Sequence, residues 1–129
     1  MMNLRKLIIG FCLIGLISCD PTHSIQLENR TGKKIQILYH TESDVRVPNP
    51  SDLKTIKLNG INYDYITLDS AEIITIGHVI ARYTPRPEDI SIDRLEIRIE
   101  SDTLRFIGKR AIFSMVNKQS RLDWRLIIN

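Results

Sequence analysis

The sequence predicts an all-β domain, an antiparallel β-sandwich of about eight strands, with a small β-barrel as the alternative. Apolar and polar residues alternate with a period of two in several stretches, as in half-buried strands. Isoleucine, a β-branched residue that favours strands, occupies many of the apolar positions. The sandwich is favoured because longer crossings separate the clear hairpins, at residues 41–51, 84–91 and 108–121.

The N-terminal part of the domain predicts two hairpins. Residues 24–30 and 34–40 alternate, and the loop between them contains a glycine that can adopt a positive φ. Asn59-Gly60, the preferred dipeptide of a type I′ turn, separates two further alternating stretches. Counting back from this turn pairs residues on a face that we expect to point toward the core. The pairs are Leu58 with Ile61 and Ile56 with Tyr63.

Residues 73–83 form a long apolar stretch with side chains on both faces. This pattern predicts a central strand covered on both sides, with a bend or bulge at Gly77. From Asp93 onward the alternation is clean again, and Leu95, Ile97 and Ile99 are expected to point inward.

The C-terminal third predicts a hairpin, a short helix and a final strand. A two-residue turn at Ser101-Asp102 would place Ile99 opposite Leu104 and Arg98 opposite Arg105. Residues 109–117 have helical spacing and predict a helix of one or two turns. The last strand alternates from residue 122 to the C-terminus.

The first 19 residues are typical of an export signal. A basic start at Arg5 and Lys6 precedes an uncharged apolar run of about 11 residues, shorter than the roughly 20 that a transmembrane helix needs. The run ends in Leu16-Ile17-Ser18-Cys19, and the whole stretch resembles the signal peptide and lipobox of bacterial lipoproteins. The resemblance implies cleavage between Ser18 and Cys19, diacylglycerol on the Cys19 sulfur, and a further acyl chain such as palmitate on the new amino terminus.

The expected organisation is a signal peptide at 1–18, a lipidated tether at 19–23 and one β-sandwich domain at 24–129. The protein would then be anchored in the bacterial cell envelope, at the outer or the inner membrane, facing the periplasm or the surface. A plain secretory signal, cut without lipidation, is the alternative. The mature region also resembles small Bacteroidota-type lipoproteins, which implies no known activity. The segments that carry this second resemblance are Leu27–Gly32, Asp102–Leu104 and Trp124–Leu126.

Charge and cysteine content narrow the function classes. Of 18 lysine and arginine residues, Arg5 and Lys6 lie in the signal peptide, which leaves 16 against 15 acidic residues. This balance suggests no nucleic-acid partner. Cys12 would leave with the signal and Cys19 would carry lipid, so the mature chain has no thiol for a disulfide, a metal site or a nucleophile.

We expect neither an enzyme nor a cofactor. The chain contains no Gly-x-Ser-x-Gly elbow, no His-Glu-x-x-His and no glycine-rich phosphate loop. His40, Glu42 and Asp44 are weak candidates for metal ligands, and a solvated loop is the simpler interpretation of them.

The expected function is a non-enzymatic accessory, scaffold or protein-interaction module that binds the membrane through Cys19 and an envelope protein through its domain. The alternatives are a small-ligand or glycan-binding lipoprotein and an inhibitor or immunity lipoprotein. The candidate binding surface combines aromatic and basic residues, namely Tyr65, Tyr83, Arg86, Arg105, Lys109 and Arg110.

Overall fold

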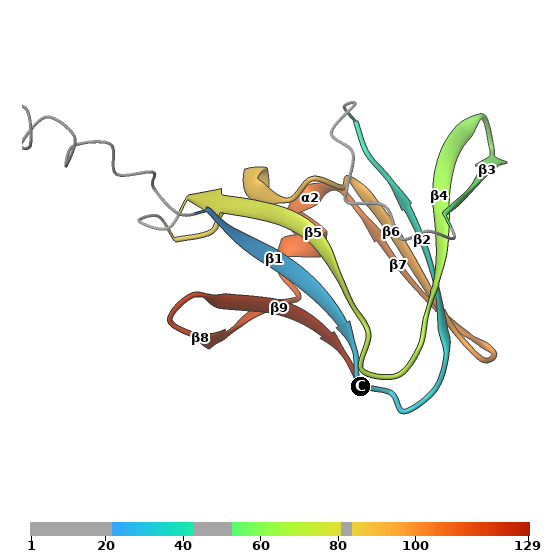
Figure 1. The fold of residues 1–129 in the computed structure, drawn as a ribbon. Coiled ribbons are helices and arrows are strands. Elements are labelled where there is room, and N and C mark those ends of the chain that lie inside the picture. Colours follow the sequence, from blue (N-terminus) through green and yellow to red (C-terminus); the bar gives the residue numbers. More distant parts are fainter. Residues whose placement is uncertain (1–21, 43–52, 81–83) are drawn as a thin grey trace, which may run out of the picture.

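The computed structural model describes residues 22–42, 53–80 and 84–129, which form two β-sheets that face each other (Figure 1). The predicted sandwich is confirmed with nine strands rather than eight, and the two sheets remain separate, so the barrel alternative is wrong. The four-stranded sheet has the order β5 (Ile73–Ile80), β1 (Thr22–Asn29), β9 (Asp123–Ile128) and β8 (Val116–Ser120). The five-stranded sheet has the order β3 (Lys54–Leu58), β4 (Ile61–Leu68), β2 (Ile35–His40), β6 (Arg94–Ile99) and β7 (Asp102–Ile107).

The strand pairs are antiparallel with one exception. β1 and β9, the first and last strands, run parallel to each other in the centre of the four-stranded sheet. β1 begins at Thr22, two residues before the predicted start, so the segment between Cys19 and the first strand is only Asp20 and Pro21.

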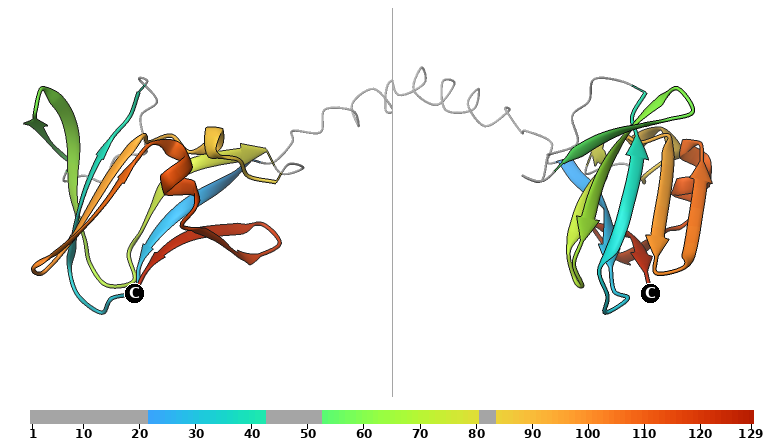
Figure 2. Two further views of the ribbon diagram at one scale, coloured as in Figure 1. Left: turned by 180° about the vertical axis from the view of Figure 1, so that it is seen from behind. Right: turned by 90° about the vertical axis from the view of Figure 1, so that its right-hand side faces the viewer.

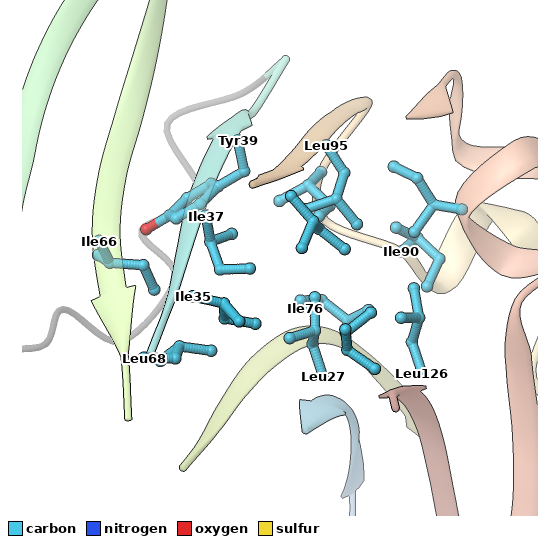
Figure 3. Packing of buried hydrophobic residues seen from close by; sticks show 14 of the residues in the cluster. Leu27, Ile35, Ile37, Tyr39, Ile66, Leu68, Ile76, Ile90, Leu95 and Leu126 are labelled. Carbon is cyan, nitrogen blue, oxygen red and sulfur yellow. The ribbon is translucent and has the colours of Figure 1, made fainter. Parts of the chain in front are cut away.

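The core consists of aliphatic side chains that alternate along the inner faces of both sheets (Figure 3). Burying such residues is the main source of stability for a domain without a disulfide. The four-stranded sheet contributes Ile25, Leu27, Ile76, Leu126 and Ile128, and the five-stranded sheet contributes Ile35, Ile37, Tyr39, Ile66, Leu68, Leu95 and Ile97.

The two sheets diverge like the sides of a wedge (Figures 1 and 2). They meet where the β1–β2 and β4–β5 connections cross, and they separate toward the other end. Two short elements close the open end, the 3₁₀-helix η1 (Pro87–Asp89) and the α-helix α2 (Lys109–Phe113). Ile90, Ile92 and Ile112 from this region are fully or almost fully buried, so these elements complete the core.

The predicted hairpin between the first two strands is wrong. β1 pairs with β5 and β9, whereas β2 pairs with β4 and β6, so the loop between β1 and β2 crosses from one sheet to the other. The Asn59-Gly60 hairpin is confirmed with its register, because Leu58 pairs with Ile61 and both turn residues have positive φ.

β5 is an edge strand rather than the predicted central one. The ladder to β1 has a bulge beside Gly77, which confirms the predicted irregularity. A Cβ at Gly77 would collide with the carbonyl oxygen of Asp89, because Gly77 forms a β-bridge with Ile90. The segment after η1 therefore covers part of this edge, which explains why the strand sequence looks buried on both sides.

The turn between β6 and β7 is Glu100-Ser101 instead of the predicted Ser101-Asp102. Ile99 pairs with Asp102, and Arg105 lies opposite Glu96 instead of Arg98. The pairing has moved by two residues, which keeps every side chain on its expected face and replaces a like-charge pair with an ion pair.

The helix predicted at 109–117 ends at Phe113. Val116 begins the additional strand β8, and Val116 pairs with Leu126 of β9 and packs against the core. The inward contact of this one aliphatic residue favours a strand over a further helical turn.

The outer face of the four-stranded sheet contains a cross-strand ion cluster. Glu28 accepts hydrogen bonds from Arg30 Nε and Arg125 Nη1, each at 2.8 Å, and Arg125 Nε also donates to Asp123. The hydrogen bonds from Arg30 and Arg125 outweigh the effect of burial and lower the pKa of Glu28 from 4.5 to about 2.

Asn29, which is fully buried, joins the two sheets where they meet. Its side-chain nitrogen donates to the carbonyl oxygens of Lys33 at 2.7 Å, Leu68 at 3.2 Å and Asp69 at 3.0 Å. Its side-chain oxygen accepts from the backbone and the hydroxyl of Thr31. One side chain thus provides hydrogen-bond partners for backbone groups of both the β1–β2 and the β4–β5 connections.

We expect Asn29→Asp to lower the free energy of unfolding by about 3 kcal/mol, because a carboxylate has no hydrogens to donate to the carbonyl oxygens of Lys33, Leu68 and Asp69. Urea denaturation of the two proteins measures the difference. Asn62→Asp is the matched control, since Asn62 is exposed on β4 and should change stability by less than about 0.5 kcal/mol. Equal effects of the two substitutions would contradict the linking role of Asn29.

The ion cluster also predicts a pH dependence. A carboxylate whose pKa is depressed in the folded state stabilises the fold above pH 4.5, and this contribution is lost as the pH falls from 4.5 toward 2. Glu28→Gln should therefore be less stable than wild type at pH 7, with a gap that narrows over that range. Denaturation midpoints measured across pH test this, with Glu88→Gln at an exposed position as the control. A gap that is constant with pH would refute the role of the Glu28 charge.

Candidate functional site

A groove lies on the outer face of the five-stranded sheet. The β3–β4 hairpin bends out of the plane of β2, β6 and β7 (Figure 2), and the groove between the hairpin and β6–β7 has a volume of about 460 Å³. One wall is formed by Leu58, Asn59, Ile61 and Tyr63, and the other by Arg94, Leu95, Glu96, Arg98, Arg105, Phe106 and Ile107.

The strand registers arrange the outer face in rows of opposite residues. One row crosses the sheet from Lys54 through Tyr65, Leu38 and Glu96 to Arg105. Leu38 is fully buried although it lies on the outer face, so its neighbours cover it on this side as the core covers Ile37 on the other. The centre of the outer face is therefore closely packed around Leu38.

The next row contains His40, Arg94 and Ile107 as direct neighbours. The ring of His40 meets the ring of Tyr63 edge to face, with centroids 6.2 Å apart. His40 Nδ1 lies 2.7 Å from Asp93 Oδ1, which fixes the orientation of the imidazole. Ile107, at the end of the row, is 71% exposed.

The groove is basic. Glu96 accepts hydrogen bonds from Arg98 Nε at 2.6 Å and from Arg105 Nε at 2.8 Å. Burial on its own raises the pKa of Glu96, but the hydrogen bonds from both arginines outweigh it, so the pKa is lowered and the group stays ionised. Arg94 also lines the groove, so its lining contains three arginines and one glutamate. The excess of positive charge favours an acidic occupant.

β7 borders the groove and is an edge strand of the five-stranded sheet, because no further strand among the described residues pairs with it. In a hairpin with a two-residue turn, the flanking pair Ile99–Asp102 is hydrogen-bonded and the following pairs alternate. The backbone N–H and C=O groups of Thr103, Arg105 and Ile107 therefore point away from β6. These groups are the ones that an added strand would use.

The other three edges within the described ranges are protected. The segment after η1 covers part of β5, with Ser91 donating its backbone N–H to the Ile76 oxygen at 2.8 Å. β3 carries Lys54 and Lys57, and four of the five residues of β8 are polar. Charged and polar residues discourage pairing with another chain. β7 lacks lysine and exposes Leu104 and Ile107, so it is the least protected of the four.

The residues of the predicted binding surface do not form one surface. Tyr65 and Arg105 lie in the same row of the outer face, but three strand-to-strand spacings, roughly 14 Å in total, separate them. Arg86 precedes η1, and Lys109 and Arg110 lie on α2, which contacts η1 at the open end of the wedge. Tyr83 lies outside the described residues.

The candidate metal ligands are only partly described. His40 contacts Asp93, Glu42 is exposed, and Asp44 lies outside the described residues. Within residues 22–42, 53–80 and 84–129, no three His, Cys, Asp or Glu side chains come together as a metal site would require. Over the same ranges, no helix has the length and apolar character needed to cross a membrane.

The sequence reasoning missed the groove because it assigned one hairpin face to the core. Leu58, Ile61 and Tyr63 pair as predicted, yet they face outward, and Ile66 and Leu68 are the residues of β4 that enter the core. The signal that could have found this lies at the end of β4, where the aliphatic Ile66 and Leu68 flank the polar Thr67 and so place the odd-numbered side chains outside. Asn62 and Asp64, on the same face as Ile66, hide this signal in the first half of the strand.

Comparisons with known proteins add no family to these features. No protein-family model matches the chain, and searches of the curated proteins and of the solved structures find no significant match. The basic groove, the open β7 edge and the expected lipid anchor at Cys19 are thus the three features on which a functional proposal rests.

Proposed function

We propose that this protein is a lipid-anchored component of the bacterial cell envelope that holds an extended segment of a partner protein on its five-stranded sheet, without catalysing a reaction. The observation that carries this proposal is the open β7 edge beside a basic, partly apolar groove. Backbone hydrogen bonds along the edge supply affinity, and the groove supplies selectivity.

The chemistry of the groove describes the partner. An added strand would continue the rows of the outer face, so that its alternate side chains lie next to Arg105 and Ile107. A segment with an acidic and an aliphatic residue two positions apart fits these two neighbours. An inhibitor or immunity lipoprotein would use the same edge, with an exported toxin as its partner.

The groove also suggests a second candidate, a small-ligand or glycan-binding role. Its volume of about 460 Å³ lies within the range of ligand pockets, and Tyr63 offers an aromatic surface on one wall. The open edge favours the protein partner, because a small ligand would leave the backbone groups of β7 unused.

The anchor makes a direct prediction. Cells fed labelled palmitate should transfer the label to the wild-type protein and to Cys12→Ala, whose substitution lies within the expected signal peptide. Cys19→Ala should take up no label, because it removes the sulfur to which lipid is first attached. Gel fluorography of the immunoprecipitated protein reads the result. Label on Cys19→Ala would refute the lipoprotein assignment.

The edge makes a second prediction, tested by photo-crosslinking in living cells. A photoreactive residue at Thr103 or Ile107 on β7 should capture one and the same envelope protein, and a residue at Asn117 or Gln119 on β8 should not. Arg105→Pro, combined with the Ile107 probe, should abolish capture, because proline removes an edge N–H that β6 does not use.

Arg105→Ala is the matched control for this experiment, since it keeps the N–H and removes only the guanidinium. It should weaken capture through the loss of charge without abolishing it. Capture that persists in Arg105→Pro, or that is equally strong from β8, would exclude strand addition at β7.

A further inference from the structure

We infer that the tip of the β8–β9 hairpin, formed by Lys118, Arg121 and Leu122, lies on the anionic surface of the membrane that holds the lipid anchor. This inference rests on the proposed lipidation of Cys19 and adds an orientation of the domain. It follows from the parallel pairing of the first and last strands, from the length of the tether and from the chemistry of the tip.

The parallel β1–β9 ladder places the tip beside the start of the domain. Ile25 lies opposite Trp124, and both strands run in the same direction. β9 begins at Asp123, so Arg121 and Leu122 lie in the turn just before it, at the end of the sheet where β1 also begins. Figure 1 shows the β8–β9 turn at the same end of the sheet as the start of β1.

The covalent chain then keeps this end close to the lipid. Cys19 and Thr22 are separated by three Cα steps, which span at most about 11 Å when fully extended. A longer linker would let the domain tumble freely above the bilayer. With so short a tether, the start of β1 and the neighbouring hairpin tip stay within reach of the headgroups.

The tip has the composition that a headgroup surface favours. Leu122 is 48% exposed and Arg121 is exposed, and Lys118 lies with its ammonium 5.8 Å from the centre of the Trp124 ring. The nearest acidic residue on β9, Asp123, accepts a hydrogen bond from Arg125 Nε at 2.8 Å, so its charge is compensated. Basic residues close to the headgroups are attracted to anionic lipid, and an exposed leucine can enter the interface between headgroups and acyl chains.

The far end of the domain lies away from the bilayer in this orientation. Lys33, just after β1, forms an ion pair with Glu100 in the β6–β7 turn at 2.7 Å. That turn therefore lies at the far end of β1, a strand whose eight residues span roughly 25 Å from Thr22. In this orientation the start of β7 lies on the side of the domain away from the bilayer, where a partner can approach it.

Site-specific fluorescence in vesicles tests the inference. The lipidated mature protein is reconstituted into vesicles of phosphatidylcholine with phosphatidylglycerol, and an environment-sensitive probe is attached to Leu122→Cys or Ser101→Cys. The introduced cysteine is the one free thiol, because Cys12 leaves with the signal and Cys19 carries lipid. Quenchers carried by lipid headgroups should quench the probe at 122 and leave the probe at 101 in the β6–β7 turn unaffected.

The charge contribution has its own matched pair of variants. Lys118→Gln with Arg121→Gln, added to the 122 probe, should lower the ratio of membrane-contacting to free orientations about 30-fold, the effect expected of two basic residues near an anionic surface. Lys33→Gln with Lys34→Gln removes the same charge at the far end and should have no effect on this ratio. Vesicles of phosphatidylcholine alone should reproduce the loss caused by the first pair.

The outcomes separate the two proposals. Mass spectrometry of the purified mature chain shows first whether Cys19 carries diacylglycerol, and its absence would refute the anchor together with the orientation. A lipidated protein whose probe at 122 is no more quenched than the probe at 101 would refute the orientation alone. Equal effects of the two charge pairs would likewise overturn the contact of the hairpin tip with the membrane.

Discussion

The hydrogen bonds of Asn29 are the constraint on which the rest of this structure depends. The two sheets share no strand pairing, and two of the connections that cross between them, β1–β2 and β4–β5, lie at the end where the wedge is closed. At that point one buried amide donates to carbonyl oxygens of both crossing connections and accepts from Thr31. Without a disulfide, a saturated polar side chain does the joining that a covalent link does in many exported domains.

The wedge shape determines which edges of the sheets remain available. Because the sheets separate toward one end, η1 and α2 are needed there to bury the core, and the segment that follows η1 also pairs with β5. This pairing covers part of the β5 edge of the four-stranded sheet. The five-stranded sheet keeps β7 uncovered, with Leu104 and Ile107 exposed, so the possible docking edge is a consequence of how the core is closed.

The same electrostatic arrangement occurs on both outer faces with different results. On each face a carboxylate, Glu28 or Glu96, is held ionised by two arginines, one of them from another strand in each case. The Glu28 cluster lies over the paired central strands β1 and β9. The Glu96 cluster lies beside the bent β3–β4 hairpin and borders a groove with surplus positive charge, so the two outer faces differ in shape and in charge.

The sequence by itself determined the local features of this protein. The period-two alternation and the β-branched composition predicted a β-sandwich, and Asn59-Gly60 set the register of its hairpin, because a two-residue turn with two positive φ angles allows one pairing. The resemblance of Leu16-Ile17-Ser18-Cys19 to a lipobox is likewise local, and the anchor at Cys19 is a proposal that rests on it. These features depend on residues that are close in the chain, so the sequence contains the information needed to predict them.

Tertiary structure decided every feature that involves distant residues. Alternation shows that the two faces of a strand differ, but it does not show which face packs against the other sheet. Tyr63 was therefore expected in the core, whereas in the structure it lines the groove. A shift of two residues preserves alternation, so the pattern allowed either β6–β7 turn, and the observed one pairs Arg105 with Glu96. β5 looked central because the segment after η1 covers its edge, and the parallel neighbour of β1 comes from the opposite terminus. Each of these choices depends on contacts between segments far apart in the chain, which local pattern and turn chemistry do not specify.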